Sequence, residues 1–124
     1  MKYRLMDLLA CPICKTFPLS LYVFEVSEVE ISRNVSRTCE EYCGFESKFI
    51  RDINDLKCNI CLSKEIIEGA LICCNCNRWY PIIDEIPHML PDDLRNKDAD
   101  ILFLKSHASK LPEKILYQGK PFHL

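Results

Sequence analysis

The sequence is poor in glycine and histidine, and the motifs that many enzymes build from these residues are absent. Its three glycines are scattered through 124 residues, which excludes a phosphate-binding loop and a dinucleotide fingerprint. Neither a Gly-x-Ser-x-Gly nor a His-Glu-x-x-His motif occurs. The three histidines, none at metal-ligand spacing, are His88, His107 and His123. We therefore expect that this chain has no catalytic residues and is not an enzyme.

Long apolar runs and an excess of basic charge are also missing. No run approaches the length that crosses a bilayer, and no apolar signal-peptide segment follows Met1. The formal net charge is -2, so the chain lacks the basic field that drives binding to phosphate backbones. These absences predict a soluble, cytoplasmic protein that does not bind a membrane and does not bind RNA unaided.

Cysteine, in contrast, is abundant, with nine residues in this short chain. In a reducing compartment, clustered thiols usually indicate a metal site. Cys11 and Cys14 form one Cys-x-x-Cys pair, and Cys73 and Cys76 form another, each beside a strand-like run. One pair alone is a weak signal, but two pairs suggest a tetrahedral four-cysteine zinc site, closed to water and substrate and therefore structural. Cys74 does not fit the spacing and is interpreted as a spare thiol.

Four more cysteines lie in a polar region, residues 32–64, that we interpret as a central insert. They are Cys39, Cys43, Cys58 and Cys61. Thr38 and Glu41 fit a capping box, which predicts a helical turn with Cys39 and Cys43 on one face. The spacing leaves three alternatives open: a second zinc ion, two disulfides as in intracellular proteins of hyperthermophiles, or unlinked thiols.

The apolar pattern predicts a small α+β fold. Residues 17–26 are rich in aromatic and β-branched side chains and indicate a strand, and residues 70–72 and 80–83 indicate a hairpin across the second cysteine pair. Leu5, Leu8 and Leu9 share the spacing of one helix face, and Asp98 is placed to cap a final helix. On that helix, one apolar face would be shared by Ile101, Leu104, Ala108 and Leu111.

We therefore expect a zinc-ribbon-like antiparallel β-sheet with short flanking helices and a cysteine-containing central insert. The expected organisation is a discontinuous zinc-ribbon domain over 1–31 and 65–97, the insert over 32–64, and a C-terminal helical segment over 98–124.

An extended, proline-punctuated segment follows the predicted hairpin. Such an edge offers unpaired backbone groups and large apolar side chains, which suit strand addition to another protein. The predicted partner-binding residues are Ile82, Ile83, Ile86, Pro87, Met89 and Leu90. The alternative is that Ile83, Ile86 and Met89 pack under the final helix.

Two blocks resemble a known family, the small zinc-binding activator subunit shared by methyltransferases that modify tRNA, rRNA and translation release factors. The blocks are LLACPIC at 8–14 and EGALICCNCNRWYPIIDEIPHMLP at 68–91, and they look most like the archaeal form. The resemblance implies zinc on Cys11, Cys14, Cys73 and Cys76, and a ribbon that docks by continuing the sheet of its partner. It also implies a heterodimer with a class I S-adenosylmethionine-dependent methyltransferase, which alone contacts RNA. The central cysteines depart from the family, whose corresponding segment is usually helical and free of thiols.

Two other functions fit parts of the pattern. A zinc ribbon that binds RNA directly would use Arg78 on phosphate and Trp79 on a base. An oxidoreductase would need an exposed thiol of lowered pKa, whereas zinc would occupy all four sulfurs of the paired motifs.

Overall fold

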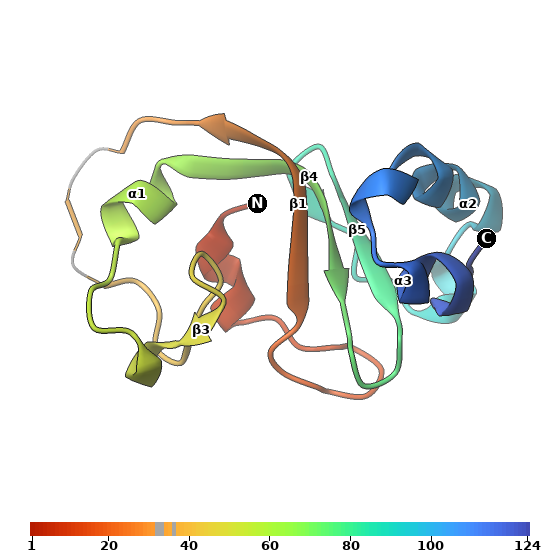
Figure 1. The fold of residues 1–124 in the computed structure, drawn as a ribbon, viewed down its shortest axis with the longest axis horizontal. Helices are drawn as coiled ribbons and strands as arrows, with labels where there is room; N and C mark the ends of the chain where they lie inside the picture. The colour runs from red at the N-terminus through yellow and green to blue at the C-terminus, as the bar shows by residue number, and fades with distance from the viewer. Residues whose placement is uncertain (32–33, 36) are drawn as a thin grey trace.

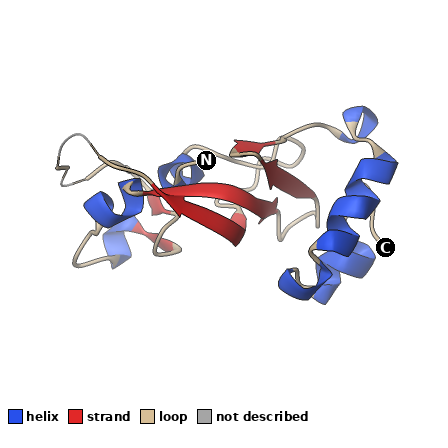
Figure 2. Cartoon of the chain, turned by 90° about the horizontal axis from the view of Figure 1, so that it is seen from above, coloured by secondary structure: helices blue, strands red, loops and turns tan. Residues whose placement is uncertain are grey.

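The computed structural model describes residues 1–31, 34–35 and 37–124. An antiparallel sheet of four strands, in the order β1-β4-β5-β6, forms its centre. The strands are β1 (Ser20–Glu28), β4 (Lys64–Ile72), β5 (Trp79–Ile83) and β6 (Ile86–Pro87). The N-terminal segment and the insert lie at one end of the molecule and the C-terminal helices at the other, with the sheet between them (Figures 1 and 2). The predicted fold class, including the hairpin across the second cysteine pair, is confirmed.

Both faces of the β4–β5 hairpin are buried, because alternate residues of these two strands enter different cores. In β4, Leu71 joins a core with the N-terminal segment, whereas Ile72 joins a second core with the C-terminal helices. In β5, Tyr80 enters the first core and Trp79 the second. The β4–β5 hairpin is thus the shared wall of two cores, and each cysteine pair sits at its margin.

The second core is closed by α2 (Lys97–Ser106) and α3 (Glu113–Gln118). A short 3-10 turn, η3 (Asp92–Leu94), precedes α2, and another, η4 (Ala108–Lys110), lies between the two helices. Phe103 of α2 stacks on Trp79 with ring centroids 5.7 Å apart. The predicted cap Asp98 is wrong: Asn96 caps α2, its side chain accepting from the Ala99 amide at 2.9 Å, and Asp98 lies within the first turn. Of the predicted apolar face, Leu104 and Leu111 are buried. The single helix predicted to carry that face is wrong, because α2 ends at Ser106 and Ala108 and Leu111 lie beyond it.

A charged pair is buried beside the same tryptophan. Arg95 and Asp100 meet at 2.9 Å and expose only 9% and 6% of their surface. The Arg95 guanidinium also lies over the Trp79 ring, 4.6 Å from its centroid, and donates to the Trp79 carbonyl at 2.7 Å. These contacts tie β5 to the start of α2.

The first core is closed by η1 (Tyr3–Asp7), a 3-10 helix where a short helix was predicted. The predicted inward face is wrong for Leu8, which lies just beyond the helix and is 76% exposed. Met6 is buried instead, because three residues per turn and an end at Asp7 rotate the apolar face away from Leu8.

The described part of the insert contains four short elements: β2 (Tyr42–Cys43), β3 (Lys48–Phe49), η2 (Ile50–Asp52) and α1 (Cys58–Leu62). The predicted helical turn at Cys39 is wrong. The Asp7 carboxylate accepts from three consecutive amides, those of Glu40, Glu41 and Tyr42, at 2.8 to 3.0 Å. A distant carboxylate therefore binds the Glu41 amide, which the Thr38 side chain would bind in a capping box, together with the amides on either side of it.

The division into ribbon, insert and C-terminal segment stays a prediction, and its boundary at residue 32 lies outside the described residues. Over the part of the chain that the structure covers, no helix has the length and apolar character needed to cross a membrane.

Candidate metal centre and docking edge

The first cysteine pair lies in a tight loop between η1 and β1. The Lys15 amide donates to the Cys11 carbonyl at 2.8 Å, and the Cys11 amide donates to the Thr16 carbonyl at 3.0 Å. Lys15 adopts a positive φ of 66°, which turns the chain immediately after Cys14. These bonds fold the loop so that both sulfurs leave it on the same side.

The second pair, in the β4–β5 connection, repeats this geometry. The Asn77 amide donates to the Cys73 carbonyl at 2.9 Å, and the Cys73 amide donates to the Arg78 carbonyl at 2.9 Å. Asn77, the residue after Cys76, also has a positive φ, of 62°. Two separate segments therefore form equivalent knuckles from the same pattern of cysteines.

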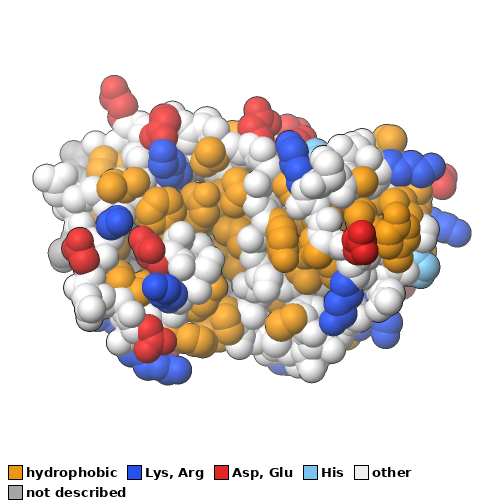
Figure 3. Space-filling view, in the orientation of Figure 1, with side chains coloured by type: hydrophobic (Ala, Val, Ile, Leu, Met, Phe, Trp, Pro, Cys, Tyr) orange, Lys and Arg blue, Asp and Glu red, His pale blue; other side chains and the backbone are white. Residues whose placement is uncertain are grey.

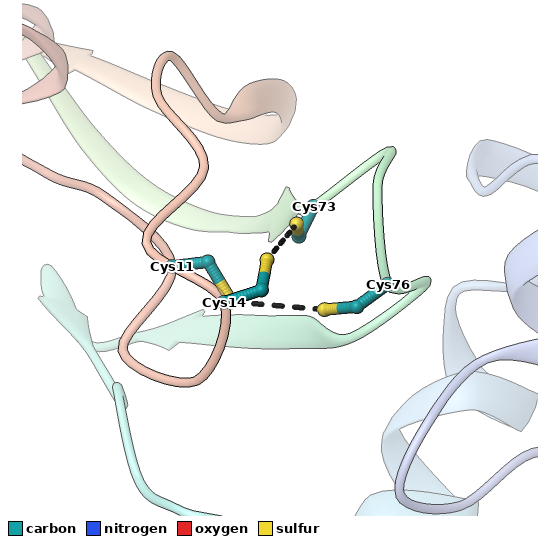
Figure 4. Close-up of side chains that lie close together, drawn as sticks. All are labelled: Cys11, Cys14, Cys73 and Cys76. Atoms are coloured by element: carbon teal, nitrogen blue, oxygen red, sulfur yellow. Dashed lines mark hydrogen bonds between the residues drawn. The ribbon is translucent and has the colours of Figure 1, made fainter.

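The sulfurs of the two knuckles converge, as Figure 4 shows. All four ligand atoms of Cys11, Cys14, Cys73 and Cys76 lie within 4.8 Å of one another. The Cys11 and Cys76 sulfurs are 3.7 Å apart, and those of Cys14 and Cys73 are 3.4 Å apart. A zinc ion bound by four sulfurs at about 2.3 Å spaces them by about 3.8 Å, so this donor set fits one tetrahedral ion.

The pKa values of Cys14 and Cys73 are shifted in opposite directions. Hydrogen bonds from the side chains of Asn75 and Thr16 lower the pKa of Cys14, whereas burial raises the pKa of Cys73. Two thiolates this close repel each other unless a positive charge lies nearby. A divalent cation would supply the missing charge and favour both thiolates.

Side chains around the cluster hold it in place. The Tyr80 hydroxyl is hydrogen-bonded to the Cys11 sulfur at 3.2 Å. Arg78 donates to both carboxylate oxygens of Asp92, at 2.9 and 2.8 Å. The hydrogen bond to Asp92, and to a lesser extent one to the Cys76 sulfur, raises the pKa of Arg78. Arg78 therefore stays charged beside the cluster. The sequence alone did not single out Tyr80 or Asp92 in this role. Tyr80 lies two residues after Arg78, but Asp92 reaches Arg78 only through the fold.

The remaining thiols differ in their surroundings. Cys74 is exposed, next to a buried Cys73, as expected for a spare thiol. The four cysteines of the insert are buried and form no disulfide in the described structure. Among the described residues, the two knuckles form the single group of three or more cysteine, histidine, aspartate or glutamate side chains that lie close enough together to hold a metal ion. No histidine belongs to this group.

The two residues that would favour direct RNA binding are engaged within the chain. Trp79 has no exposed surface, and its indole N–H donates to the Phe122 carbonyl at 3.0 Å. Arg78 is occupied by Asp92. The expectation that Trp79 is available for base stacking is therefore wrong. On the face drawn in Figure 3, acidic and basic side chains are interspersed around hydrophobic patches and form no continuous basic area.

The predicted docking segment forms the β6 edge of the sheet. Ile82 is wrongly included among the partner contacts, because its side chain is fully buried in the first core. Ile86 on β6 is 60% exposed, and Ile83 and Leu90 are 36% and 40% exposed. Met89 is half-buried and packs against the first core.

A groove of about 240 Å³ runs between this edge and α2. Its apolar lining includes Ile83, Leu90 and Leu94, the last of which is 63% exposed. The docking segment thus lies beside α2, but its side chains leave an open groove between the two. Apolar side chains on an edge strand beside an open groove make this part of the surface the best candidate for a protein contact.

Comparison with known proteins gives the same picture. A family model described as Trm112p-like protein matches residues 2–85, a span that contains both knuckles. The protein "Multifunctional methyltransferase subunit trm112" of Schizosaccharomyces pombe is 50% identical over 32 residues, which are 26% of this chain and 25% of that protein. The match thus spans about a quarter of the length of the relative. Since the family model covers more than half of the chain, the protein belongs to the Trm112p-like family.

Proposed function

We propose that this chain is a non-catalytic subunit that activates and stabilises S-adenosylmethionine-dependent methyltransferases acting on the translation machinery, on tRNA, rRNA or a release factor. The observation that carries the proposal is membership of a family with a relative named as a methyltransferase subunit. The partner would be a class I enzyme that supplies the cofactor site and the chemistry, in a heterodimer with this chain.

The metal centre supports a structural role. We propose that Cys11, Cys14, Cys73 and Cys76 hold one zinc ion. Four sulfurs complete its shell, so the ion has no open position at which water or substrate would react. Its contribution would be to lock the N-terminal loop to the β4–β5 hairpin and so to fix the edge of the sheet beyond it.

Docking would take place at the β6 edge. A partner strand pairing with Ile86–Pro87 would extend the sheet, and the apolar side chains of Ile83, Ile86 and Leu90 would be covered in the same step. The groove beside α2 would take a partner side chain. Burial of these residues is favourable, and the same contact would shield apolar surface of the enzyme.

Co-purification tests the partner. The tagged chain, recovered from its native cell, is expected to bring down at least one methyltransferase in stoichiometric amount. In titration calorimetry, S-adenosylmethionine is expected to bind the heterodimer and not the isolated chain. Tight cofactor binding by the isolated chain would contradict the proposal.

A zinc ribbon that binds RNA directly is not favoured, because Trp79 is buried and Arg78 is paired. Salt-dependent RNA binding by the isolated chain would support that alternative, and partner-dependent binding would support the activator.

A further inference from the structure

Cysteine supplies most of the fully buried residues in the described part of the insert. Six residues are buried in its described part: Cys39, Tyr42, Cys43, Gly44, Cys58 and Cys61. Tyr42 belongs to the first core, and a Cβ on Gly44 would lie 2.6 Å from both the Tyr3 carbonyl oxygen and the Met6 side chain, so both serve contacts outside the insert. The four thiols are therefore the fully buried side chains left to a segment that has only very short helices and strands. Small units without a hydrophobic core usually need a metal or disulfides.

The four thiols line one common cavity of about 10 Å³. The rest of its wall is largely apolar, made by Phe45, Ile50 and Leu56, with Thr38 and Lys57 at its margin. A space of this size holds about one ion or one water molecule. A water would need two to four polar partners, whereas the cavity offers mainly sulfur, which suits a soft metal cation.

Different elements bring the thiols to this cavity. Cys39 lies next to the backbone that the Asp7 carboxylate holds, and Cys43 ends β2. Cys58 and Cys61 are three residues apart on α1, so they project from the same side of the helix. The electrostatic influence of all three other thiols reaches Cys61, whose pKa is raised to about 12 by burial and then by Cys43, Cys39 and Cys58.

We propose that Cys39, Cys43, Cys58 and Cys61 bind a second structural zinc ion, independent of the ion between the two knuckles. Each thiol gives up its proton as the ion binds, and the ion with its four thiolates carries a net charge of -2. The Lys2 ammonium offsets part of this charge, because it acts on Cys61. Unlike the knuckle sulfurs, these four sulfurs do not form a group close enough together to hold an ion in the described structure. Binding therefore requires side-chain rotation to the spacing of about 3.8 Å that a four-sulfur zinc site has.

This ion would give the insert a centre that its sequence otherwise lacks. It would join the strand end at Cys43 to α1, on the side of the sheet where η1 packs. The proposal does not depend on the methyltransferase partner, since it concerns only contacts within this chain.

Metal counting tests the proposal directly. The full chain, purified under reducing conditions without added zinc, is expected to carry two zinc ions in native mass spectrometry. Cys58→Ser is expected to carry one, and the matched control Cys74→Ser, which changes an exposed thiol outside both sites, is expected to keep two. One zinc in the wild type, with no loss in Cys58→Ser, would overturn the proposal.

Two measurements on the wild type decide the question even if Cys58→Ser does not fold. Cobalt titration into the metal-free chain is expected to give the spectrum of a tetrahedral four-thiolate site up to two equivalents, and saturation at one equivalent would contradict it. Thiol titration after denaturation with chelator is expected to find all nine thiols. A count of five would show that the central cysteines form two disulfides, and an iron–sulfur spectrum would refute zinc as the metal.

Discussion

Two neighbouring cysteines provide a stringent test of the knuckle site, because Cys76 points into the sulfur cluster and Cys74 is exposed. Serine is nearly isosteric with cysteine but is a poor zinc ligand. If no metal were present, Cys76→Ser would change a half-buried side chain and would cost about 1 kcal/mol or less. Any larger loss of stability would report on the metal.

The expected loss is large. A structural zinc site in a small protein contributes on the order of 10 kcal/mol to folding, and the whole net stability of a domain is only about 5 to 15 kcal/mol. Removing one of four ligands is therefore expected to lower the free energy of unfolding by more than about 5 kcal/mol, enough to unfold the sheet near room temperature. Cys74→Ser is expected to stay within about 0.5 kcal/mol of the wild type.

Urea unfolding followed by tryptophan fluorescence measures this difference. The chain has one tryptophan, Trp79, which is buried against Phe103 and lies next to the second knuckle. Its emission is expected to show cooperative unfolding for the wild type and Cys74→Ser, and little or no transition for Cys76→Ser. If both serine variants unfold within about 1 kcal/mol of each other, the knuckles do not hold a stabilising metal.

Three further predictions concern docking, pH and the buried ion pair. Ile86→Ala is expected to weaken binding to the co-purified methyltransferase about 5- to 30-fold, since covering an Ile side chain that is 60% exposed is worth about 1 to 2 kcal/mol; Leu102→Ala on α2, 66% exposed, is the control and should change nothing. Asp7→Asn should cost about 1 to 2 kcal/mol at pH 7 in urea unfolding, because a charged acceptor for three amides is lost. Burial would raise the pKa of Asp7, but those amides lower it overall. The Asp7 carboxylate therefore stabilises the folded chain above about pH 4, and this contribution disappears as pH falls through the lowered pKa. An equal cost of Asp7→Asn at pH 3 and pH 7 would contradict this. Arg95→Met should cost about 3 to 5 kcal/mol by leaving Asp100 buried without its partner, and Arg95→Met combined with Asp100→Leu should recover part of that loss; no recovery would show that packing on Trp79 dominates.

The parts of the fold that depend on local pattern were predictable. The run from Glu68 to Leu90 combines two continuous apolar stretches with a cysteine pair, and it forms the β4–β5 hairpin and β6 as expected. The two knuckles were predictable for the same reason, because ligand spacing and turn geometry are both local.

The parts that depend on distant contacts were not. Thr38 and Glu41 satisfy the local rule for a helix start, yet the Asp7 carboxylate, far away in the sequence, binds the amides from Glu40 to Tyr42 and holds this stretch in a non-helical path. Burial of Trp79 and Ile82 follows from two cores sharing one hairpin, which no single segment reveals. The charged Arg95 and Asp100 also read as surface residues until their mutual contact is known.

The separation of the knuckles along the chain has a consequence for synthesis. During translation the first knuckle leaves the ribosome with only two sulfurs, and the site cannot be completed until Cys76 has followed it. The cysteines from 39 to 61 emerge earlier and lie nearer to one another in sequence. If the insert binds zinc as proposed, we expect the growing polypeptide to load that ion first. A nascent chain that has emerged from the ribosome beyond Cys61 but not as far as Cys73 would then hold one ion while its amino-terminal loop still lacks the hairpin.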